Sequence, residues 1–349
     1  MSRMLLAACL AACVAAGPAP GAETRQVAGL APNPGDLLMY EYVPDGLPRG
    51  SPLVVALHGC TQSAKDFDDE SGWTGLAERY RFAVLLPEQQ EANSEDRCFN
   101  WFLDGDNHRD RGEAASIKAM VDRMVADHRV NLGQVFVTGF SAGGAMTAVM
   151  LAAYPEVFAG GSIIAGVPYG CASTEGQPFL DALRQAFLAT NPFGEAGWAA
   201  YACGITRLAV PFRFTPFDRQ PEAWADQVRR AGAPTPPSWP KVLLWQGDDD
   251  QTVHPMNLQE LLDQWTAVEG IDEVPDGEER TATYHRRDFA DATGEVRVEA
   301  FDLPGMGHAV PVDPRPGPAR CGEVGGYFVD RHVCAAFQAA RSWSLTDGR

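Results

Sequence analysis

Residues 135–152 read VFVTGFSAGGAMTAVMLA, and the pentapeptide GFSAG at 139–143 decides the fold. The apolar, β-branched residues 135–138 predict a buried strand, and the small residues 142–153 predict a helix. Ser141 lies at the junction, where a tight turn needs glycine on both sides so that neighbouring backbone can approach closely. The bare pentapeptide also arises by chance, but between a strand and a helix it indicates a nucleophilic serine.

Apolar runs alternate with helical segments along much of the chain. Strands are predicted at 37–43, 52–57, 82–86, 160–165, 241–246 and 296–303, and helices at 72–79, 113–128, 257–268 and 331–343. This alternation predicts an α/β fold with a mostly parallel central sheet and helices on both faces.

Residues 171–240 interrupt this alternation with prolines, aromatic residues and two short helical patterns at 178–189 and 221–231. We expect them to form a cap-like insertion over the carboxyl edge of the sheet, where active sites of such folds form. Residues 272–280 are expected to be a solvated turn.

The first 22 residues have the pattern of a signal peptide. Arg3 provides a basic start, residues 5–16 are apolar, and small residues precede Gly17. The apolar stretch is too short for a stable membrane span, and no later run approaches membrane-spanning length. We expect an extracellular or periplasmic protein in which residues 23–349 form one domain. The alternative is a membrane-tethered lipoprotein, because residues 10–13, LAAC, resemble a bacterial lipobox with Cys13 as the lipidated residue.

The overall charge and the cysteine count further restrict the function. With 28 basic and 46 acidic residues the formal net charge is −18, which would repel a nucleic-acid backbone. Six cysteines lie outside the leader, and an even number in an exported chain predicts three disulfides. Order along the sequence suggests the pairs Cys60–Cys98, Cys171–Cys203 and Cys321–Cys334. Six cysteines can pair in about fifteen ways, so the other pairings stay open, as do buried free thiols. Their spacing is not that of a zinc site.

A nucleophilic serine needs a base to take its proton and an acid to orient the base, in the chain order serine, acid, histidine. His308 fits this order, because it ends the glycine-rich loop PGMGH (304–308) that directly follows the strand predicted at 296–303. His254 is the weaker alternative. A loop histidine bonded only to backbone is the non-catalytic interpretation of His308.

The acid is expected in GDDD (247–250), which directly follows the strand predicted at 241–246. Spacing from the glycine favours Asp250, and Asp248 is the alternative. A calcium site is disfavoured because no EF-hand spacing follows. The acidic residues of the DGD loop at 104–106, with Asp110 and Glu113, are interpreted as a solvated loop rather than a metal site.

Attack on an ester carbonyl creates an oxyanion that needs preorganised N–H donors. The amide of Ala142, at a helix N-terminus, is the first candidate, and the amide of Cys60, in the loop after the strand at 52–57, is the second. A bond to Cys98 would hold the Cys60 loop rigid. The competing interpretation makes the Cys60 thiol the nucleophile, but the neighbouring sequence shows nothing that would lower the pKa of this thiol. One or two of five tryptophans are expected to line an acyl pocket: Trp73, Trp101, Trp198, Trp239 and Trp245.

Five segments together resemble the polyhydroxybutyrate (PHB) depolymerase-type esterases of the α/β-hydrolase superfamily. They are LHGCTQ (57–62), RCFNWF (97–102), VTGFSAGGAMTAVMLAAYPEVFAGGSIIAGVPYGCA (137–172), WQGDDDQTVHPMN (245–257) and GMGHAVPV (305–312). The resemblance covers most of residues 35–343 and implies that Ser141 is the nucleophile, Asp250 the acid and His308 the base. Two features depart from the family pattern: Gln246-Gly247 replaces its His-Gly, and residues 185–217 form a longer segment.

The resemblance implies an exported serine carboxylesterase that hydrolyses short-chain polyhydroxyalkanoate esters or oligomers through an acyl-enzyme, without a cofactor. A feruloyl or acetylxylan esterase acting on plant cell-wall esters is the alternative within the family. Depolymerases of solid granules usually carry an appended binding domain; we expect none here, which makes a soluble oligomer or small ester an equally expected substrate. A catalytically silent binding protein on the same scaffold is the alternative from another class.

Overall fold

The computed structural model describes residues 22–206 and 214–347. The predicted leader up to residue 21, with its lipobox and Cys13, lies outside these residues. None of the helices within the described ranges combines the length and the apolar character that crossing a bilayer requires.

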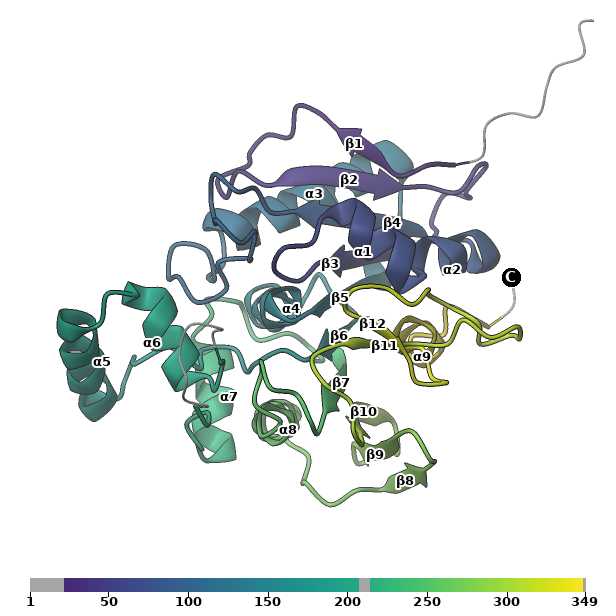
Figure 1. The fold of residues 1–349 in the computed structure, drawn as a ribbon. Helices are drawn as coiled ribbons and strands as arrows, with labels where there is room; N and C mark the ends of the chain where they lie inside the picture. Colours follow the sequence, from purple (N-terminus) through teal and green to yellow (C-terminus); the bar gives the residue numbers. More distant parts are fainter. Residues whose placement is uncertain (1–21, 207–213, 348–349) are drawn as a thin grey trace, which may run out of the picture.

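A ten-stranded sheet forms the centre of the molecule (Figure 1). Its strands are β1 (Arg25–Val27), β2 (Leu38–Tyr42), β3 (Leu53–Leu57), β4 (Ala83–Glu88), β5 (Val135–Phe140), β6 (Gly160–Ile164), β7 (Lys241–Gly247), β8 (Gly277–Arg280), β9 (His285–Ala290) and β10 (Val296–Leu303). Their order in space is β1-β2-β4-β3-β5-β6-β7-β10-β9-β8. The strands from β4 to β10 in this order run parallel, and those at the two edges are antiparallel. The predicted mostly parallel sheet is confirmed.

Helices cover both faces of the sheet and create two hydrophobic cores. One core packs α3 (Gly112–His128), α4 (Ala142–Ala153) and α8 (Asn257–Glu269) against one face. The other packs α1 (Ala64–Ser71), α2 (Trp73–Tyr80) and α9 (Ala335–Ser342) against the opposite face. Residues of β3 alternate between the two cores, with Val55 in the first and Val54 in the second. Burial on both faces explains why the central strands are continuous apolar runs rather than alternating ones.

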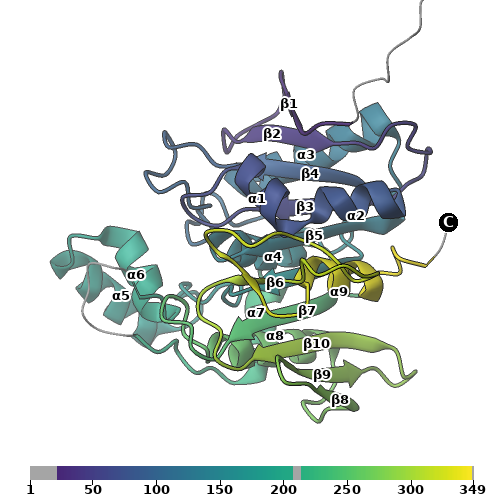
Figure 2. The same ribbon diagram turned by 45° about the vertical axis from the view of Figure 1, so that its right-hand side comes forward.

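In its described residues, the connection from β6 to β7 contains the helices α5 (Pro178–Thr190), α6 (Gly194–Ala202) and α7 (Pro221–Arg229). In both views α5 and α6 project from one end of the sheet (Figure 2). A small third core around Trp198 and Trp224 joins α6 and α7 to Ala145 of α4. The disulfide Cys171–Cys203 closes the base of this segment.

Several elements were not predicted from the sequence. The expectation of a solvated turn over 272–280 is wrong for residues 277–280, which form β8 and pair with β9 at the sheet edge. These two strands carry mainly charged, partly exposed residues, so they lack the apolar run that revealed the central strands. Also unpredicted are α1, α6, the short 3₁₀ helix η1 (Leu132–Gln134), and the pair β11 (Val310–Val312) and β12 (Phe328–Asp330).

Candidate active site

The turn between β5 and α4 holds Ser141 in a strained conformation, with φ 56° and ψ −117°. A side chain on Gly143 would place its Cβ 2.2 Å from the carbonyl oxygen of Leu57, and one on Gly139 would lie 2.3 Å from that of Gly143. The Ser141 amide donates to the carbonyl of Ile164 at 2.9 Å. The two glycines of the motif are therefore required by backbone packing, and the serine is held at the carboxyl edge of the sheet.

Three side chains that are distant in sequence meet at this edge. The Nε2 atom of His308 lies 2.9 Å from the Oγ of Ser141, and its Nδ1 lies 2.7 Å from the Oδ2 of Asp250. Asp250 is buried, whereas Ser141 and His308 are partly exposed. This chain of two hydrogen bonds has the order and the geometry of a serine–histidine–aspartate triad.

Backbone and side-chain donors surround the Asp250 carboxylate. Its Oδ1 accepts from the amides of Thr252 at 2.8 Å and Val253 at 2.9 Å, and its Oδ2 accepts from the Nε2 of Gln246 at 3.0 Å. These donors solvate a negative charge that has no access to water. Gln246 occupies the position at which the family that this sequence resembles has histidine, and no role was predicted for it from the sequence.

The alternative acid and base have other partners. Asp248 is exposed, and its Oδ1 accepts from the amide of Gly305 at 2.6 Å, within the loop that ends in His308. His254 accepts from the amide of Met256 at 3.2 Å through its Nδ1. The structure thus brings Asp250 and His308 to Ser141, and Asp248 instead ties the acid loop to the histidine loop.

The two candidate oxyanion donors lie on loops that pack against each other. The carbonyls of Leu57 and His58 lie beside Gly143, and Gly59 lies beside Phe140. Within residues 22–206 and 214–347, no hydrogen-bond acceptor is found for the amide of Cys60 or that of Ala142, whereas the neighbouring amide of Gly59 donates to the Oε1 of Gln62 at 2.8 Å. Both amides are therefore available to an incoming oxygen.

His58 is buried directly beneath the loop that carries Cys60. Its Nδ1–H donates to the carbonyl of Gly59 at 2.7 Å, and its Nε2 accepts from the amide of Gln89 at 3.0 Å. Burial lowers the pKa of His58 to about 4, so the ring is neutral at neutral pH and keeps this tautomer. The sequence did not reveal this supporting role of His58.

Glu113 corrects an expectation drawn from the sequence. It was placed in a solvated loop, yet it is 1% exposed and accepts from the Nε2 of Gln89 at 2.5 Å. It also accepts from both the amide and the Nδ2 of Asn100, each at 2.8 Å. Burial raises the pKa of Glu113 to about 8. Because Asn100 follows Cys98 closely, this buried group fixes the segment to which Cys60 is linked.

The six cysteines outside the leader form the three disulfides suggested by their order: Cys60–Cys98, Cys171–Cys203 and Cys321–Cys334. Cys60 is therefore bonded and is not a free thiol nucleophile. The three bonds join the loop after β3 to the segment at 97–102, close the base of the insertion, and tie the segment after His308 to the start of α9.

Most of the five tryptophans are structural. Trp73 stacks on Trp343 and Trp245 stacks on Phe301, both within the second core, and Trp198 belongs to the insertion core. Trp239 is partly buried against the first core. Only Trp101 is among the residues lining a cavity of about 480 Å³ between the 101–111 loop and the insertion, whose other lining residues include Arg111, Tyr169 and Gln227. Ser141, Asp250 and His308 do not line this cavity.

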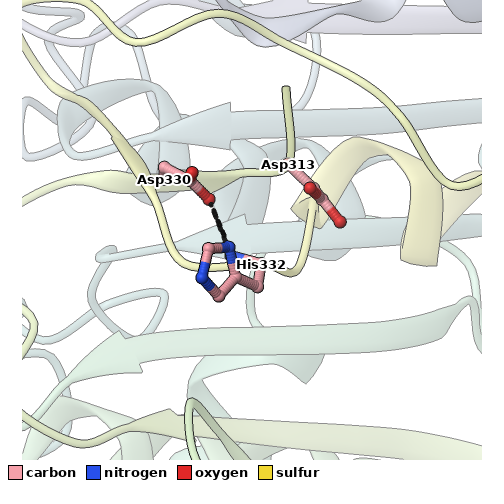
Figure 3. A group of neighbouring side chains, drawn as sticks. All are labelled: Asp313, Asp330 and His332. Carbon is pink, nitrogen blue, oxygen red and sulfur yellow. Dashed lines mark hydrogen bonds and ion pairs between the residues drawn. The ribbon is translucent and has the colours of Figure 1, made fainter. Parts of the chain in front are cut away.

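A separate group of potential metal ligands lies near β11 and β12, where atoms of Asp313, Asp330 and His332 come within 4.8 Å of one another (Figure 3). Arg315 donates to both carboxylate oxygens of Asp313, at 2.7 and 2.8 Å. His332 contacts Asp330 through its Nδ1 at 2.9 Å. Since these contacts already pair the ligand atoms with one another or with Arg315, we assign them a role in holding the β11–β12 region together.

Comparison with known proteins identifies the class. The family model described as esterase PHB depolymerase matches residues 38–191. Poly(3-hydroxyalkanoate) depolymerase C of Paucimonas lemoignei is 39% identical over 320 residues, which are 92% of this chain and 70% of that protein. Probable acetylxylan esterase A of Aspergillus clavatus is 28% identical over 83% of this chain and 84% of its own length. The solved acetyl xylan esterase from Aspergillus awamori superimposes with a TM-score of 0.66 at 26% identity, covering 82% of this chain and 94% of that one.

The fold and these relatives place the protein among the carboxylic ester hydrolases of the α/β-hydrolase superfamily. Within that class, the chain belongs to the PHB depolymerase family of esterases.

Proposed function

We propose that Ser141 is the nucleophile, His308 the general base and Asp250 the acid that orients it, with the amides of Cys60 and Ala142 as the oxyanion hole. The observation that carries this proposal is the continuous chain of hydrogen bonds from Ser141 through His308 to Asp250, at 2.9 and 2.7 Å. A further support is the pair of amides without acceptors beside the serine.

In the proposed reaction, the Nε2 of His308 takes the proton from the Ser141 hydroxyl as its Oγ attacks the ester carbonyl. The two amides stabilise the negative charge that forms on the carbonyl oxygen. His308 then returns the proton to the leaving alcohol, and the acyl group stays on Ser141. Water, deprotonated by the same histidine, attacks the acyl-enzyme and releases the acid. The reaction needs no cofactor.

For the substrate, we propose esters and oligomers of short-chain hydroxyalkanoic acids. Support comes from the relative at 39% identity, whose name states poly(3-hydroxyalkanoate) depolymerase activity. An acetylated or feruloylated plant polysaccharide is the second candidate. Its acetylxylan form has support from the Aspergillus relatives and from the cavity beside Trp101, where aromatic and hydrogen-bonding side chains occur together.

The proposal treats residues 23–349 as one catalytic domain, in which residues 171–240 form a cap-like insertion. It also takes the protein to be exported, because three disulfides persist only in an oxidising compartment. We also propose that the exported protein is released after removal of its leader rather than tethered to a membrane by a lipid on Cys13.

Replacing Ser141 with alanine tests the chemistry. We expect hydrolysis of p-nitrophenyl butyrate to fall by about 10⁵-fold or more, with an unchanged melting temperature. Labelling by a fluorophosphonate probe should be lost in parallel. Retained hydrolysis, or labelling of the variant, would refute the assignment and leave a binding function on this scaffold as the better account.

A substrate panel tests the specificity. Hydroxybutyrate trimers, acetylated xylan and methyl ferulate are compared by kcat/KM with the same enzyme preparation. The proposal expects the trimers to be preferred. A higher value on acetylated xylan or methyl ferulate would move the protein to the second candidate without affecting the catalytic residues.

A further inference from the structure

Helix α5 buries none of its side chains, although all of its residues lie in the described part of the chain. On its inner side, Phe187 packs against Trp198 and Tyr201 of α6, and Arg184 pairs with Glu195. The Oδ1 of Asp181 also accepts from the Oγ1 of Thr174, in the preceding loop, at 3.1 Å. In both views α5 is the outermost element of the insertion (Figures 1 and 2). A helix normally gains its stability by burying an apolar face.

The outer face of α5 is also apolar. Phe179, Ala182, Ala186 and Ala189 recur at intervals of three and four residues, and all are exposed. Phe179 has 79% of its surface exposed, and Phe193, just beyond the helix, has 47%. We call these four residues, with Pro192 and Phe193, the α5 apolar face.

The exposed surface of α5 carries no charged residue. Besides the α5 apolar face, its exposed residues are Pro178, Gln185 and Thr190. The only charged residues of the helix, Asp181 and Arg184, are partly buried. A solvent-facing helix in a chain with 46 acidic and 28 basic residues would ordinarily show charges there. An exposed helix face that is uncharged and mainly apolar fits against another surface.

An open hollow continues the α5 apolar face at its N-terminal end. Pro178, Phe179, Leu180 and Phe217 supply its apolar lining, with Gln177, Asp218 and Arg219 at its polar part. Its volume of about 420 Å³ is large enough for several repeat units of a small aliphatic ester.

The α5–α6 unit is fixed to the loop that carries the acid. Ile205, shortly after α6, forms a β-bridge with Val253. The amide of Thr206 donates to the carbonyl of Thr252 at 2.8 Å, and that of His254 donates to Gly204 at 2.9 Å. A surface held by α5 would therefore keep a defined position relative to Asp250.

We propose that the α5 apolar face and the adjoining hollow dock onto the surface of an insoluble, uncharged aliphatic polyester, such as poly(3-hydroxybutyrate). This inference rests on the proposed function, because such a polyester is the polymeric form of the proposed hydroxyalkanoate oligomers. Exposed aromatic side chains gain free energy when an apolar solid removes them from water, and an uncharged polymer is not repelled by a chain of charge −18.

Charge and area disfavour two other occupants. A second copy would bring another charge of −18, and a 13-residue helix offers a face of only about 200 Å², against the about 800 Å² per partner that a stable dimer buries. Helices that lie on anionic bilayers carry several lysines or arginines, whereas α5 has one arginine, paired with Glu195.

Adsorption of the Ser141→Ala protein to amorphous poly(3-hydroxybutyrate) particles, measured by depletion from solution, tests the proposal without hydrolysis. Adding Phe179→Ser and Phe193→Ser should lower the partition coefficient about tenfold or more. The matched control adds Leu132→Ser and Val274→Ser, which are 58% and 69% exposed elsewhere, and should change it by less than about twofold. Melting temperatures establish that both variants are folded.

Adsorption unaffected by the Phe179/Phe193 pair, or lowered equally by the control pair, would overturn the proposal. The proposal would also be overturned if the Phe179/Phe193 substitutions abolished binding to phosphatidylglycerol vesicles, or a dimer seen in light scattering, but left adsorption to polyester unchanged. An intact enzyme that adsorbs through α5 but does not cleave hydroxybutyrate trimers would refute the proposed function alone. One that cleaves the trimers but adsorbs independently of α5 would refute the docking surface alone.

Discussion

The elbow at Ser141 and helix α5 occupy opposite extremes of packing in this molecule. Every residue of α4, which follows the elbow, is buried, and Gly143 lies against the backbone of β3. Helix α5 buries no side chain and rests on α6 through a few rings and one ion pair. This contrast indicates where the fold tolerates substitutions. The proposed nucleophile depends on close backbone contacts that leave no space for a larger residue, whereas the proposed docking surface lies outside the sheet.

The largest difference should come from the proposed acid Asp250 compared with its neighbour Asp248. We expect Asp250→Asn to lower kcat for p-nitrophenyl butyrate about 10⁴-fold, because the neutral amide no longer holds the reactive tautomer of His308. Asp248→Asn, two residues away and exposed, is the matched control and should lower kcat by less than about tenfold, since the asparagine Oδ1 can still accept from the amide of Gly305 and only an exposed charge is lost. Equal losses in both variants would contradict the choice between the two aspartates.

A smaller effect, on the free energy of unfolding, should distinguish Gly143 in the elbow from Gly75, a helix glycine that faces open space. Gly143→Ala would place its Cβ 2.2 Å from the carbonyl oxygen of Leu57, and we expect it to lower the free energy of unfolding by about 3 kcal/mol or more. Gly75→Ala, in α2 with no atom near its Cβ, should instead raise it by about 0.5–1 kcal/mol. Urea unfolding of both variants measures this contrast, and a stable, active Gly143→Ala protein would disprove it.

The buried histidine beneath the Cys60 loop should make stability depend on pH. Its pKa is lowered to about 4, so between that pH and about 6.5 the unfolded chain binds a proton that the folded chain does not. The contribution of His58 to stability is therefore fully present above about pH 6.5 and falls as the pH drops towards 4, by about 2 kcal/mol between pH 6 and 4.5. The difference in free energy of unfolding between the wild type and His58→Gln should therefore change by about 2 kcal/mol between pH 6 and 4.5, which urea unfolding at both pH values measures. An unchanged difference would contradict the prediction.

The smallest effect is expected in the insertion. Arg184→Ala removes the ion pair with Glu195 between two partly exposed side chains, and should cost less than about 1 kcal/mol. The esterase activity on a soluble ester should not change measurably. A loss of several kcal/mol would mean that α5 is an integral part of the folded core, contrary to the comparison drawn above.

The sequence predicts the central strands and Ser141 because buried parallel strands are apolar runs and the elbow needs its glycines. It does not distinguish Asp250 from Asp248 by chemistry, since the difference lies in burial and in the donors from Gln246, Thr252 and Val253. The edge strands β8 and β9 are not predicted from the sequence, because most of their residues are charged. Helix α1 is polar, but its capping box between Ser63 and Asp66 was a usable signal.

Burial of polar side chains is what the sequence reveals least. Glu113 sits in an acidic stretch typical of a solvated loop, and only the tertiary contacts with Gln89 and Asn100 explain its position. His58, likewise, is one of seven histidines until the Gly59 carbonyl and the Gln89 amide are seen on either side of its ring.

The distribution of the disulfides has a practical consequence for producing the enzyme. Each of the three bonds secures a different loop around the sheet, and the sheet itself contains none. We therefore expect that material made in a reducing bacterial cytosol loses activity to a greater extent than it loses secondary structure. Titration of free thiols, rather than spectra of secondary structure, is the appropriate quality criterion for any preparation used in the assays above.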